Sequence, residues 1–114
     1  MDNSNKHQAR TVFAIPVDLF EKFKAALSWE GASIPKVLSQ FMFNYTKYLD
    51  KSFIKNKSLL KGKKVQVPIL ISDTVSEKFT EKAKQDKLKP PIIIAQFMKN
   101  YVDFTNMNEK NHRT

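Results

Sequence analysis

The sequence predicts a mainly helical domain with two short β-strands, built from one strand–helix–helix unit that occurs twice. The first observation behind this prediction is an internal repeat, because Gln40–Tyr45 (QFMFNY) returns as Gln96–Tyr101 (QFMKNY), 56 positions later (96 − 40 = 56). The second is a change of hydrophobic period within each copy, from two residues, typical of a strand, to about 3.6, typical of an amphipathic helix. A fixed internal period of this size indicates one supersecondary unit used twice.

The repeat extends without a gap well beyond these two hexapeptides. Identical residues at the same offset are Ile15 and Ile71, Glu21–Phe23 and Glu77–Phe79, and Pro35 and Pro91. Each copy alone has only about fifty residues, near the lower limit for a chain that folds unaided. The two copies are therefore expected to share one core.

The strand of each copy is expected just before the period changes. Residues 9–15 (ARTVFAI) are rich in β-branched and aromatic types and end at Pro16, and residues 64–71 (KVQVPILI) alternate between two faces. The residues expected to face the core are Thr11, Phe13, Ile15, Val65, Val67, Ile69 and Ile71. Because a lone strand leaves backbone groups without partners, the two strands are expected to pair.

Two amphipathic helices are expected after each strand. In the first copy an apolar stripe runs between Asp18 and Glu30, and a second stripe covers residues 34–49. In the second copy one helix follows Ser72 and another covers residues 93–104. The candidate helix caps are Ser33 and Ser72 at N-termini and Gly31 at a C-terminus.

The repeat also divides the chain into segments. Residues 1–8 are predicted to be an unstructured tail, 9–50 the first unit, 51–63 a linker, 64–104 the second unit, and 105–114 a second unstructured tail. The linker contains four apolar residues, which predict that part of it packs on the core as an extra helical turn. These residues are Phe53, Ile54, Leu59 and Leu60.

The composition favours a polyanionic partner and argues against catalysis. Lys and Arg number 20 against 11 Asp and Glu, a formal net charge of +9. Such an excess in a small chain favours nucleic acid first and an acidic membrane second as partners, or else serves as a solubilising surface.

The chain has no Cys, no signal-like segment and no long apolar run, so a cytoplasmic location is expected. His7 and His112 lie in opposite tails, and no Gly-rich phosphate loop or zinc-spaced cluster is present. We therefore expect no enzyme activity, metal, cofactor or small-molecule substrate.

The order strand, helix, turn, helix, with Pro16 after the strand and Gly31–Ser33 between the helices, resembles the ribbon-helix-helix family of DNA-binding proteins, of the Arc and methionine repressor type. The resemblance covers residues 10–49 and again 66–104. It implies a two-stranded antiparallel β-ribbon above four interlocked helices. Here both units lie in one chain, which implies an intramolecular pseudo-dimer, as in the tandem members of conjugation systems.

The resemblance also implies that the ribbon enters the major groove of DNA and that the side chains pointing away from the core read the bases. The positions that match are Arg10, Val12, Ala14, Gln66, Pro68 and Leu70. Arg10 would bind guanine O6 and N7, Gln66 would pair with adenine, and Val12 or Leu70 would contact thymine methyl groups. If the repeats pair symmetrically, Arg10 faces Leu70 and Gln66 faces Ala14, which leaves a polar reader at each end of an apolar centre.

The family's second anchor is the N-terminus of the second helix of each unit, where backbone N–H groups hold a phosphate. In the first unit the matching residues are Ser33 and Lys36, and in the second they are Lys87 and Lys89 before Pro90–Pro91, which lack N–H donors. Lys64 stands at the start of the second strand. A solvated turn explains these lysines equally well.

The predicted function is binding of double-stranded DNA, either as a transcriptional repressor or as an accessory factor at a plasmid or phage DNA site, of relaxosome type. Self-association on DNA stays open, and no membrane partner is expected. The alternative is a protein–protein interaction module of the same fold that no longer reads bases. Its docking patch would be the apolar part of the ribbon, formed by Val12, Pro68 and Leu70.

Overall fold

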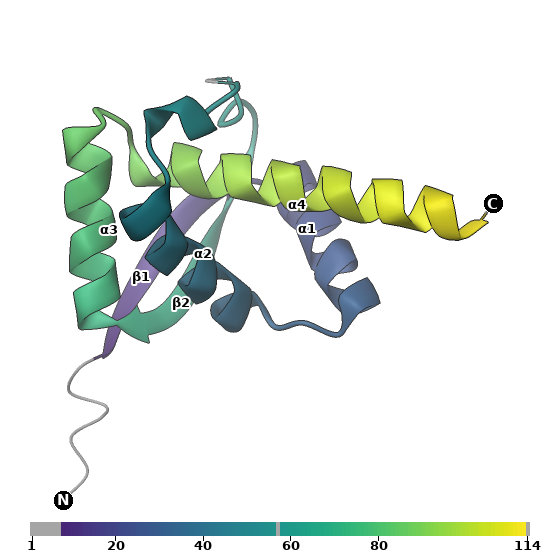
Figure 1. The fold of residues 1–114 in the computed structure, drawn as a ribbon, viewed down its shortest axis with the longest axis horizontal. Helices are drawn as coiled ribbons and strands as arrows, with labels where there is room; N and C mark the ends of the chain where they lie inside the picture. Colours follow the sequence, from purple (N-terminus) through teal and green to yellow (C-terminus); the bar gives the residue numbers. More distant parts are fainter. Residues whose placement is uncertain (1–7, 57, 114) are drawn as a thin grey trace, which may run out of the picture.

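The computed structural model describes residues 8–56 and 58–113, and its elements follow the predicted order (Figure 1). Their bounds are β1 Gln8–Pro16, α1 Val17–Glu30, α2 Ile34–Tyr48, the short 3-10 helix η2 Lys51–Phe53, β2 Lys64–Ser72, α3 Asp73–Gln85 and α4 Pro90–Arg113. The predicted mainly helical fold with a two-stranded antiparallel sheet is confirmed. Within the described part of the chain, every helix is too short or too polar to cross a membrane.

The two strands pair with each other along their whole length. The register places Val12 opposite Pro68, Arg10 opposite Leu70 and Ala14 opposite Gln66, the pairing expected for symmetric repeats. The buried residues of the inner face are Phe13, Ile15, Val67, Ile69 and Ile71. Pro68 has no N–H, and a two-stranded ribbon tolerates it because each strand has one open edge.

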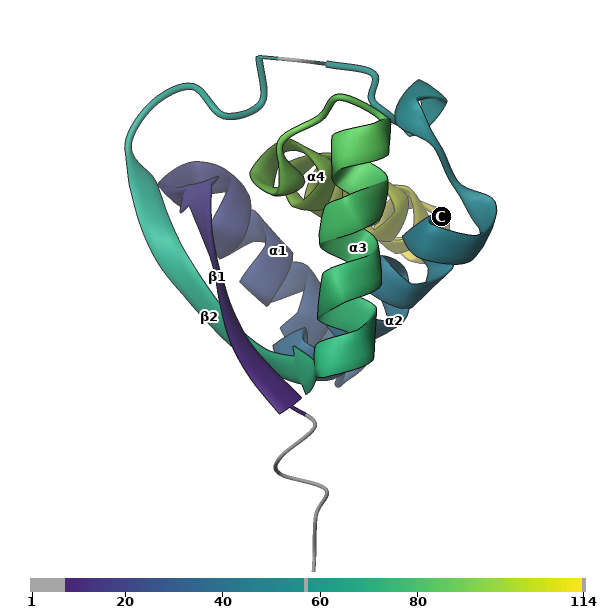
Figure 2. The same ribbon diagram turned by 90° about the vertical axis from the view of Figure 1, so that its left-hand side faces the viewer.

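In Figure 2 the ribbon lies at the left, α3 in the centre and α2 at the right, and α2 also contacts β2. The first helix of each half packs against the second helix of the other half: α1 contacts α4, and α2 contacts α3. Between the second helices, the rings of Phe41 and Phe97 stack with their centroids 4.2 Å apart. The core is therefore formed by both halves together.

Several contacts between the halves either join residues 56 positions apart or occur as equivalent pairs. Val12 pairs with Pro68 (68 − 12 = 56), and Phe41 stacks on Phe97 (97 − 41 = 56). The ring of Tyr45 lies 5.7 Å from that of Phe79, and the rings of their equivalents, Tyr101 and Phe23, are 5.4 Å apart. The two halves thus contact each other in equivalent ways.

The first helix of each half ends in the same kind of turn. Gly31 has φ 69° and Lys87, its equivalent (87 − 31 = 56), has φ 59°. After Gly31 the N–H of Ala32 donates to the carbonyl of Leu27 at 3.0 Å, and after Lys87 the N–H of Leu88 donates to the carbonyl of Ala83 at 2.9 Å. Both are Schellman turns, which favour glycine at the left-handed position.

The predicted N-caps are correct in position but not in chemistry. Ser33 precedes α2 and Ser72 precedes α3, as expected, yet neither side chain makes a capping hydrogen bond. The N-terminus of α1 follows Pro16, which has no side-chain donor or acceptor to offer. The first N–H groups of these helices therefore rely on other partners or on solvent.

The linker packs on the core, as its apolar residues predicted. Phe53 ends η2, and its ring lies 5.4 Å from that of Phe41 and 6.4 Å from that of Tyr45. The Oε1 atom of Gln96 in α4 accepts hydrogen bonds from the backbone N–H groups of Lys55 at 2.9 Å and Asn56 at 3.2 Å. These contacts fix the linker to the second helix of the second half.

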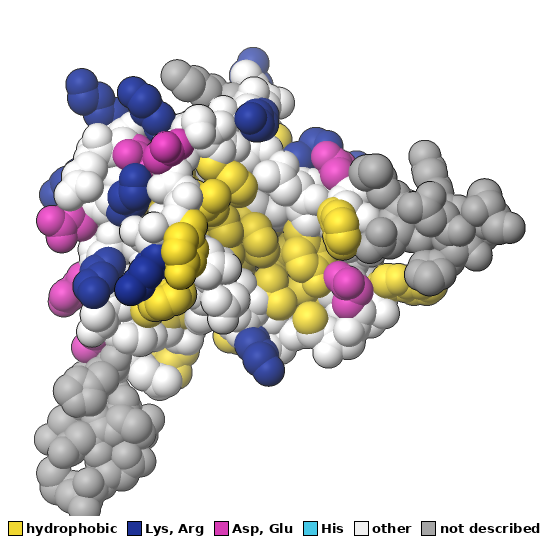
Figure 3. Space-filling view, in the orientation of Figure 1, with side chains coloured by type: hydrophobic (Ala, Val, Ile, Leu, Met, Phe, Trp, Pro, Cys, Tyr) yellow, Lys and Arg dark blue, Asp and Glu magenta, His cyan; other side chains and the backbone are white. Residues whose placement is uncertain are grey.

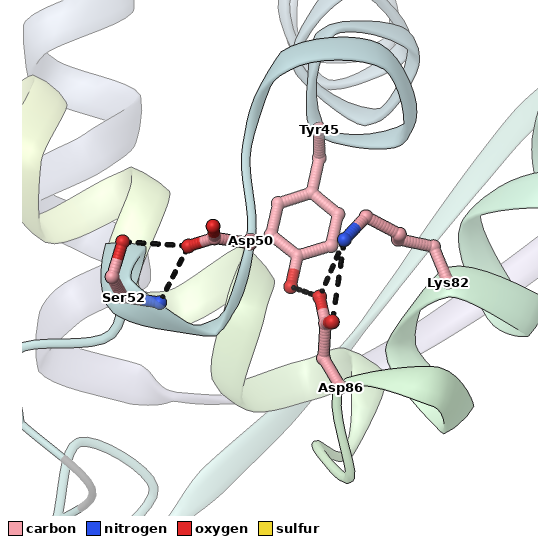
Figure 4. Close-up of polar contacts among 5 residues, drawn as sticks. All are labelled: Tyr45, Asp50, Ser52, Lys82 and Asp86. Carbon is pink, nitrogen blue, oxygen red and sulfur yellow. Dashed lines mark hydrogen bonds and ion pairs between the residues drawn. The ribbon is translucent and has the colours of Figure 1, made fainter.

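A polar network joins the two halves beside the linker (Figure 4). The hydroxyl of Tyr45 donates to Oδ2 of Asp86 at 2.6 Å, and Lys82 Nζ bonds both carboxylate oxygens of Asp86. Burial and then the Asp86 carboxylate raise the pKa of Tyr45. Nearby, the hydroxyl and N–H of Ser52 bond Asp50 and lower the pKa of its carboxyl group.

The ends of the ordered elements differ from the sequence prediction. The tail expected to be unstructured from residue 105 is helical as far as Arg113, because α4 continues past Phe104. Thr105 is 4% exposed and Val102 6% exposed, so this part of α4 is still packed. Gln8, assigned to the first tail, begins β1. The rest of that tail, residues 1–7, and Thr114 lie outside the described residues.

Candidate nucleic-acid interface

The outer face of the ribbon carries all six residues that the sequence proposed as base readers. Strand alternation turns them away from the core, because their neighbours in each strand face inward. Val12 is 46% exposed and Leu70 55% exposed; Arg10, Gln66 and Pro68 are also exposed, and Ala14 is half-buried. We call this surface the outer face of the ribbon.

The register decides how the outer face is arranged. Arg10 lies across from Leu70 towards one end, and Gln66 lies across from Ala14 towards the other. Between them Val12 faces Pro68. One polar side chain therefore stands on each side of an apolar centre, and each comes from a different strand.

The sequence reasoning missed one further polar pair on this face. Gln8 pairs directly with Ser72, and both side chains are exposed. They share the alternation of Arg10 and Leu70, so they extend the outer face by one position pair. Continuing the period-two pattern by one step in each direction would have found them, but Gln8 had been assigned to the tail and Ser72 to a helix cap.

Positive charge gathers where β2 begins. Lys61, Lys63 and Lys64 are all exposed, and the backbone carbonyl of Lys63 accepts a hydrogen bond from the N–H of Val17 at 2.9 Å. This bond holds the lysines beside the end of β1. Lys64 Nζ donates to the carbonyl of Gly62 at 3.2 Å, so its ammonium group lies beside the turn that precedes β2.

The predicted phosphate-binding residues lie at the starts of the second helices. Ser33 and Lys36 belong to the start of α2, and Lys87 and Lys89 lie in the turn between α3 and α4; all four are exposed. Pro90 and Pro91 begin α4, so this helix presents fewer N–H donors than α2. Any phosphate anchoring by the two helices is therefore unequal.

The acidic residues that pair with lysines belong to the helices and not to the ribbon. The ion pairs among the described residues are Glu21–Lys24 at 3.0 Å, Asp86–Lys82 at 3.0 Å and Asp103–Lys99 at 2.7 Å. Neither β1 nor β2 contains an acidic residue. An anion that approaches the outer face thus meets Arg10 and the lysines before β2 without a carboxylate in either strand.

Comparisons with protein-family models, with curated protein sequences and with solved structures found no match to this chain. In the described part of the chain, no three His, Asp or Glu side chains come together in a way that could hold a metal ion.

Proposed function

We propose that the chain is a ribbon-helix-helix pseudo-dimer in a single polypeptide, which binds double-stranded DNA with its ribbon in the major groove. The contacts related by the offset of 56 support the pseudo-dimer: the central strand pair of Val12 and Pro68, the stack of Phe41 on Phe97, and the reciprocal packing of α1 on α4 and of α2 on α3. A homodimer of one such unit would have the same set of contacts.

The observation that carries the DNA proposal is the outer face of the ribbon. It belongs to a two-stranded antiparallel ribbon, an element that fits the major groove. It is exposed and free of acidic residues in both strands, and a cluster of lysines stands where β2 begins. The formal net charge of +9 attracts a polyanion over a longer range.

On this proposal the two polar side chains of the outer face read bases. Arg10 binds O6 and N7 of a guanine, and Gln66 binds N6 and N7 of an adenine. The apolar centre between them, above all Val12 and Leu70, contacts thymine methyl groups. Because Arg10 and Gln66 differ, the preferred site is not a palindrome.

Phosphate contacts flank these readers. Lys64, with Lys61 and Lys63, neutralises phosphates near the start of β2, and Lys87 and Lys89 do so near the start of α4. At α2 the free N–H groups, with Ser33 and Lys36, bind a phosphate. The biological role we propose is that of a transcriptional repressor or of an accessory factor that marks a plasmid or phage DNA site.

Measuring affinity for duplex DNA at several salt concentrations tests the proposal. For a DNA-binding protein, log K falls against log salt with a slope of about −0.9 for each neutralised phosphate. We expect a slope of about −4 to −6 if five or six lysines contact phosphates. A chain that binds no duplex at low salt would overturn the proposal.

Arg10→Ala separates base reading from electrostatic adhesion. We expect it to remove about 1–3 kcal/mol of preference for the selected sequence over random duplex, while affinity for random duplex changes little. The matched control is Lys47→Ala, which removes one exposed positive charge from the last turn of α2, at a residue not proposed to contact DNA. If Arg10→Ala weakens all duplexes equally, Arg10 contacts a phosphate.

The alternative function is a protein interaction module, and one observation favours it. The centre of the outer face is apolar, since Val12 and Leu70 are 46% and 55% exposed beside Pro68. A docking module predicts that Val12→Glu abolishes partner binding and that affinity for DNA stays negligible at all salt concentrations. The salt titration therefore decides between the two functions.

A further inference from the structure

A second surface, away from the ribbon, consists of an apolar groove of about 960 Å³ between α2 and α4. We call it the Gln40 groove, and the side chains that matter here are Gln40, Phe41, Phe53, Phe97, Tyr101 and Phe104. Figure 3 shows hydrophobic side chains gathered in the centre of this face. Residues of α2 form one wall of the groove, and α2 lies at the right of Figure 2, with the ribbon at the left.

The other half has an equivalent surface, which the linker covers. The residues of the groove Gln40, Phe97 and Tyr101 correspond to Gln96, Phe41 and Tyr45, since each pair differs by 56 in number. Those three equivalents are the residues that hold the linker: Phe53 packs on Phe41 and Tyr45, and Gln96 Oε1 accepts two backbone N–H groups.

Gln40 and Gln96 make the same internal hydrogen bond, but only Gln96 is covered by the linker. Gln96 Nε2 donates to Asn100 Oδ1 at 3.0 Å, and Gln40 Nε2 donates to the equivalent Asn44 Oδ1 at 3.2 Å. The same internal bond therefore orients both side-chain carbonyls. Gln96 is 3% exposed, whereas Gln40 is exposed and its Oε1 accepts no bond from any described residue. The acceptor that binds linker backbone in one half is open in the other.

The covered surface and the open groove are also continuous. Phe53, the residue that anchors the linker, lines one end of the Gln40 groove, as do both members of the Phe41–Phe97 stack. A bound segment would therefore extend an interface that the molecule already makes with its own chain. The chemistry of that interface defines what fits: a short helical turn that ends in a large aromatic side chain, then an extended residue and two successive free N–H groups.

We propose that the Gln40 groove binds a short peptide segment of a partner protein, in which an aromatic residue at the end of a helical turn is followed by an extended aliphatic residue, as Phe53–Ile54 are in the linker. The aromatic ring of the peptide packs on Phe97 and Tyr101, and its backbone N–H groups donate to Gln40 Oε1. The groove does not include the outer face of the ribbon, but its lining includes Ser33 and Lys36, which the proposed DNA-binding mode places on a phosphate.

The test uses a synthetic peptide with the linker sequence of residues 50–56 (DKSFIKN) and the full chain labelled with ¹⁵N. We expect saturable chemical-shift changes at the side-chain amides of Gln40 and Asn44 as peptide is added. A peptide with alanine in place of its phenylalanine should bind at least tenfold more weakly, because it lacks the buried ring.

Two variants of the chain test whether Gln40 Oε1 accepts hydrogen bonds from the peptide. Gln40→Leu should weaken peptide binding about three- to tenfold, the loss expected for one hydrogen-bond acceptor. Gln85→Leu makes the same change at an exposed helical glutamine outside the groove and should leave peptide affinity unchanged. Circular dichroism establishes that both variants are folded.

Three results would overturn the proposal. One is the absence of saturable shifts at millimolar peptide. Another is a set of shifts centred on Gln96, which would mean that the peptide only displaces the linker. The third is self-association of the chain in sedimentation experiments, if the substitution Val37→Arg in the wall of the groove abolishes it. A second copy of the chain would then be the occupant.

Discussion

The hydrogen bond between Tyr45 and Asp86 ties α2 of the first half to the end of α3 in the second, and Tyr45→Phe removes it without creating a cavity. The Tyr45 side chain is 0% exposed, and its hydroxyl lies 2.6 Å from Asp86 Oδ2. A hydrogen bond to a charged group contributes about 1.5–3 kcal/mol. Because Asp86 keeps Lys82 at 3.0 Å, we expect the free energy of unfolding to fall by about 2 kcal/mol.

Urea unfolding followed by circular dichroism measures this loss. With a urea m-value of about 2 kcal/mol/M, typical of a small domain, the midpoint should fall by about 1 M. Tyr48→Phe is the matched control, because Tyr48 is 76% exposed and its hydroxyl lies in solvent; its stability should change by less than about 0.5 kcal/mol. If Tyr45→Phe lowers the free energy of unfolding no more than Tyr48→Phe does, the hydrogen bond to Asp86 does not stabilise the fold.

The same variant should change how stability depends on pH. The pKa of Tyr45 is raised by burial and by Asp86, and the pKa of Tyr101 is raised to about 12 by burial and by Glu30. A raised pKa means that the folded state holds the proton more tightly, so this stability is complete below pH about 10 and is lost as pH rises further. The stability of Tyr45→Phe is therefore compared with that of the wild type at each pH, so that effects common to both proteins cancel. Tyr45→Phe should lose less stability than wild type between pH 10 and 12.

Three further predictions follow from the geometry. Lys87→Gly should stabilise the chain by about 0.5–1 kcal/mol in urea unfolding, because glycine relieves the strained left-handed φ of 59°; Gly31→Ala should destabilise it by about 1 kcal/mol, and the opposite signs would contradict the turn geometry. Phe41→Ala should cost about 3–5 kcal/mol in the same assay, since it removes a ring 5% exposed that stacks on Phe97; a loss below 1 kcal/mol would show that the stack is not part of the core. Lys63→Ala should make the salt slope of DNA binding shallower by about 0.9; an unchanged slope would remove Lys63 from the DNA contact.

The sequence predicted the regular elements because their patterns are local. Period-two alternation in residues 64–71 and the 3.6-residue stripe in 34–49 each require only neighbouring residues, and they place β2 and α2 correctly. The same alternation identified the outer face of the ribbon before any register was known. The register followed from symmetry, because equivalent residues must lie across from each other at the centre of a symmetric pair.

The features that the sequence did not predict depend on distant contacts or on unusual backbone. Gln96 is polar and lies in an amphipathic helix, so nothing local indicates that residues 55 and 56 cover it. Lys87 gives no sign of a left-handed conformation, although its equivalence to Gly31 contains that information. The polar residues after Phe104 lack an apolar stripe, yet α4 continues through them because helical hydrogen bonds propagate readily once a helix is packed.

On the proposal of a single-chain pseudo-dimer, the union of two units in one chain accounts for the differences between the surfaces of the two halves. In a homodimer every substitution appears twice, so a ribbon must carry the same reader at both ends and two equivalent grooves must both be open or both be closed. A single chain removes this restriction: Arg10 and Gln66 occupy opposite ends of one ribbon, and one linker can cover only one of two equivalent surfaces. The core keeps its symmetry in the Phe41–Phe97 stack, where both halves must fit each other. Divergence is therefore expected outside the shared core, and the two halves differ on the outer face of the ribbon and at the Gln40 groove.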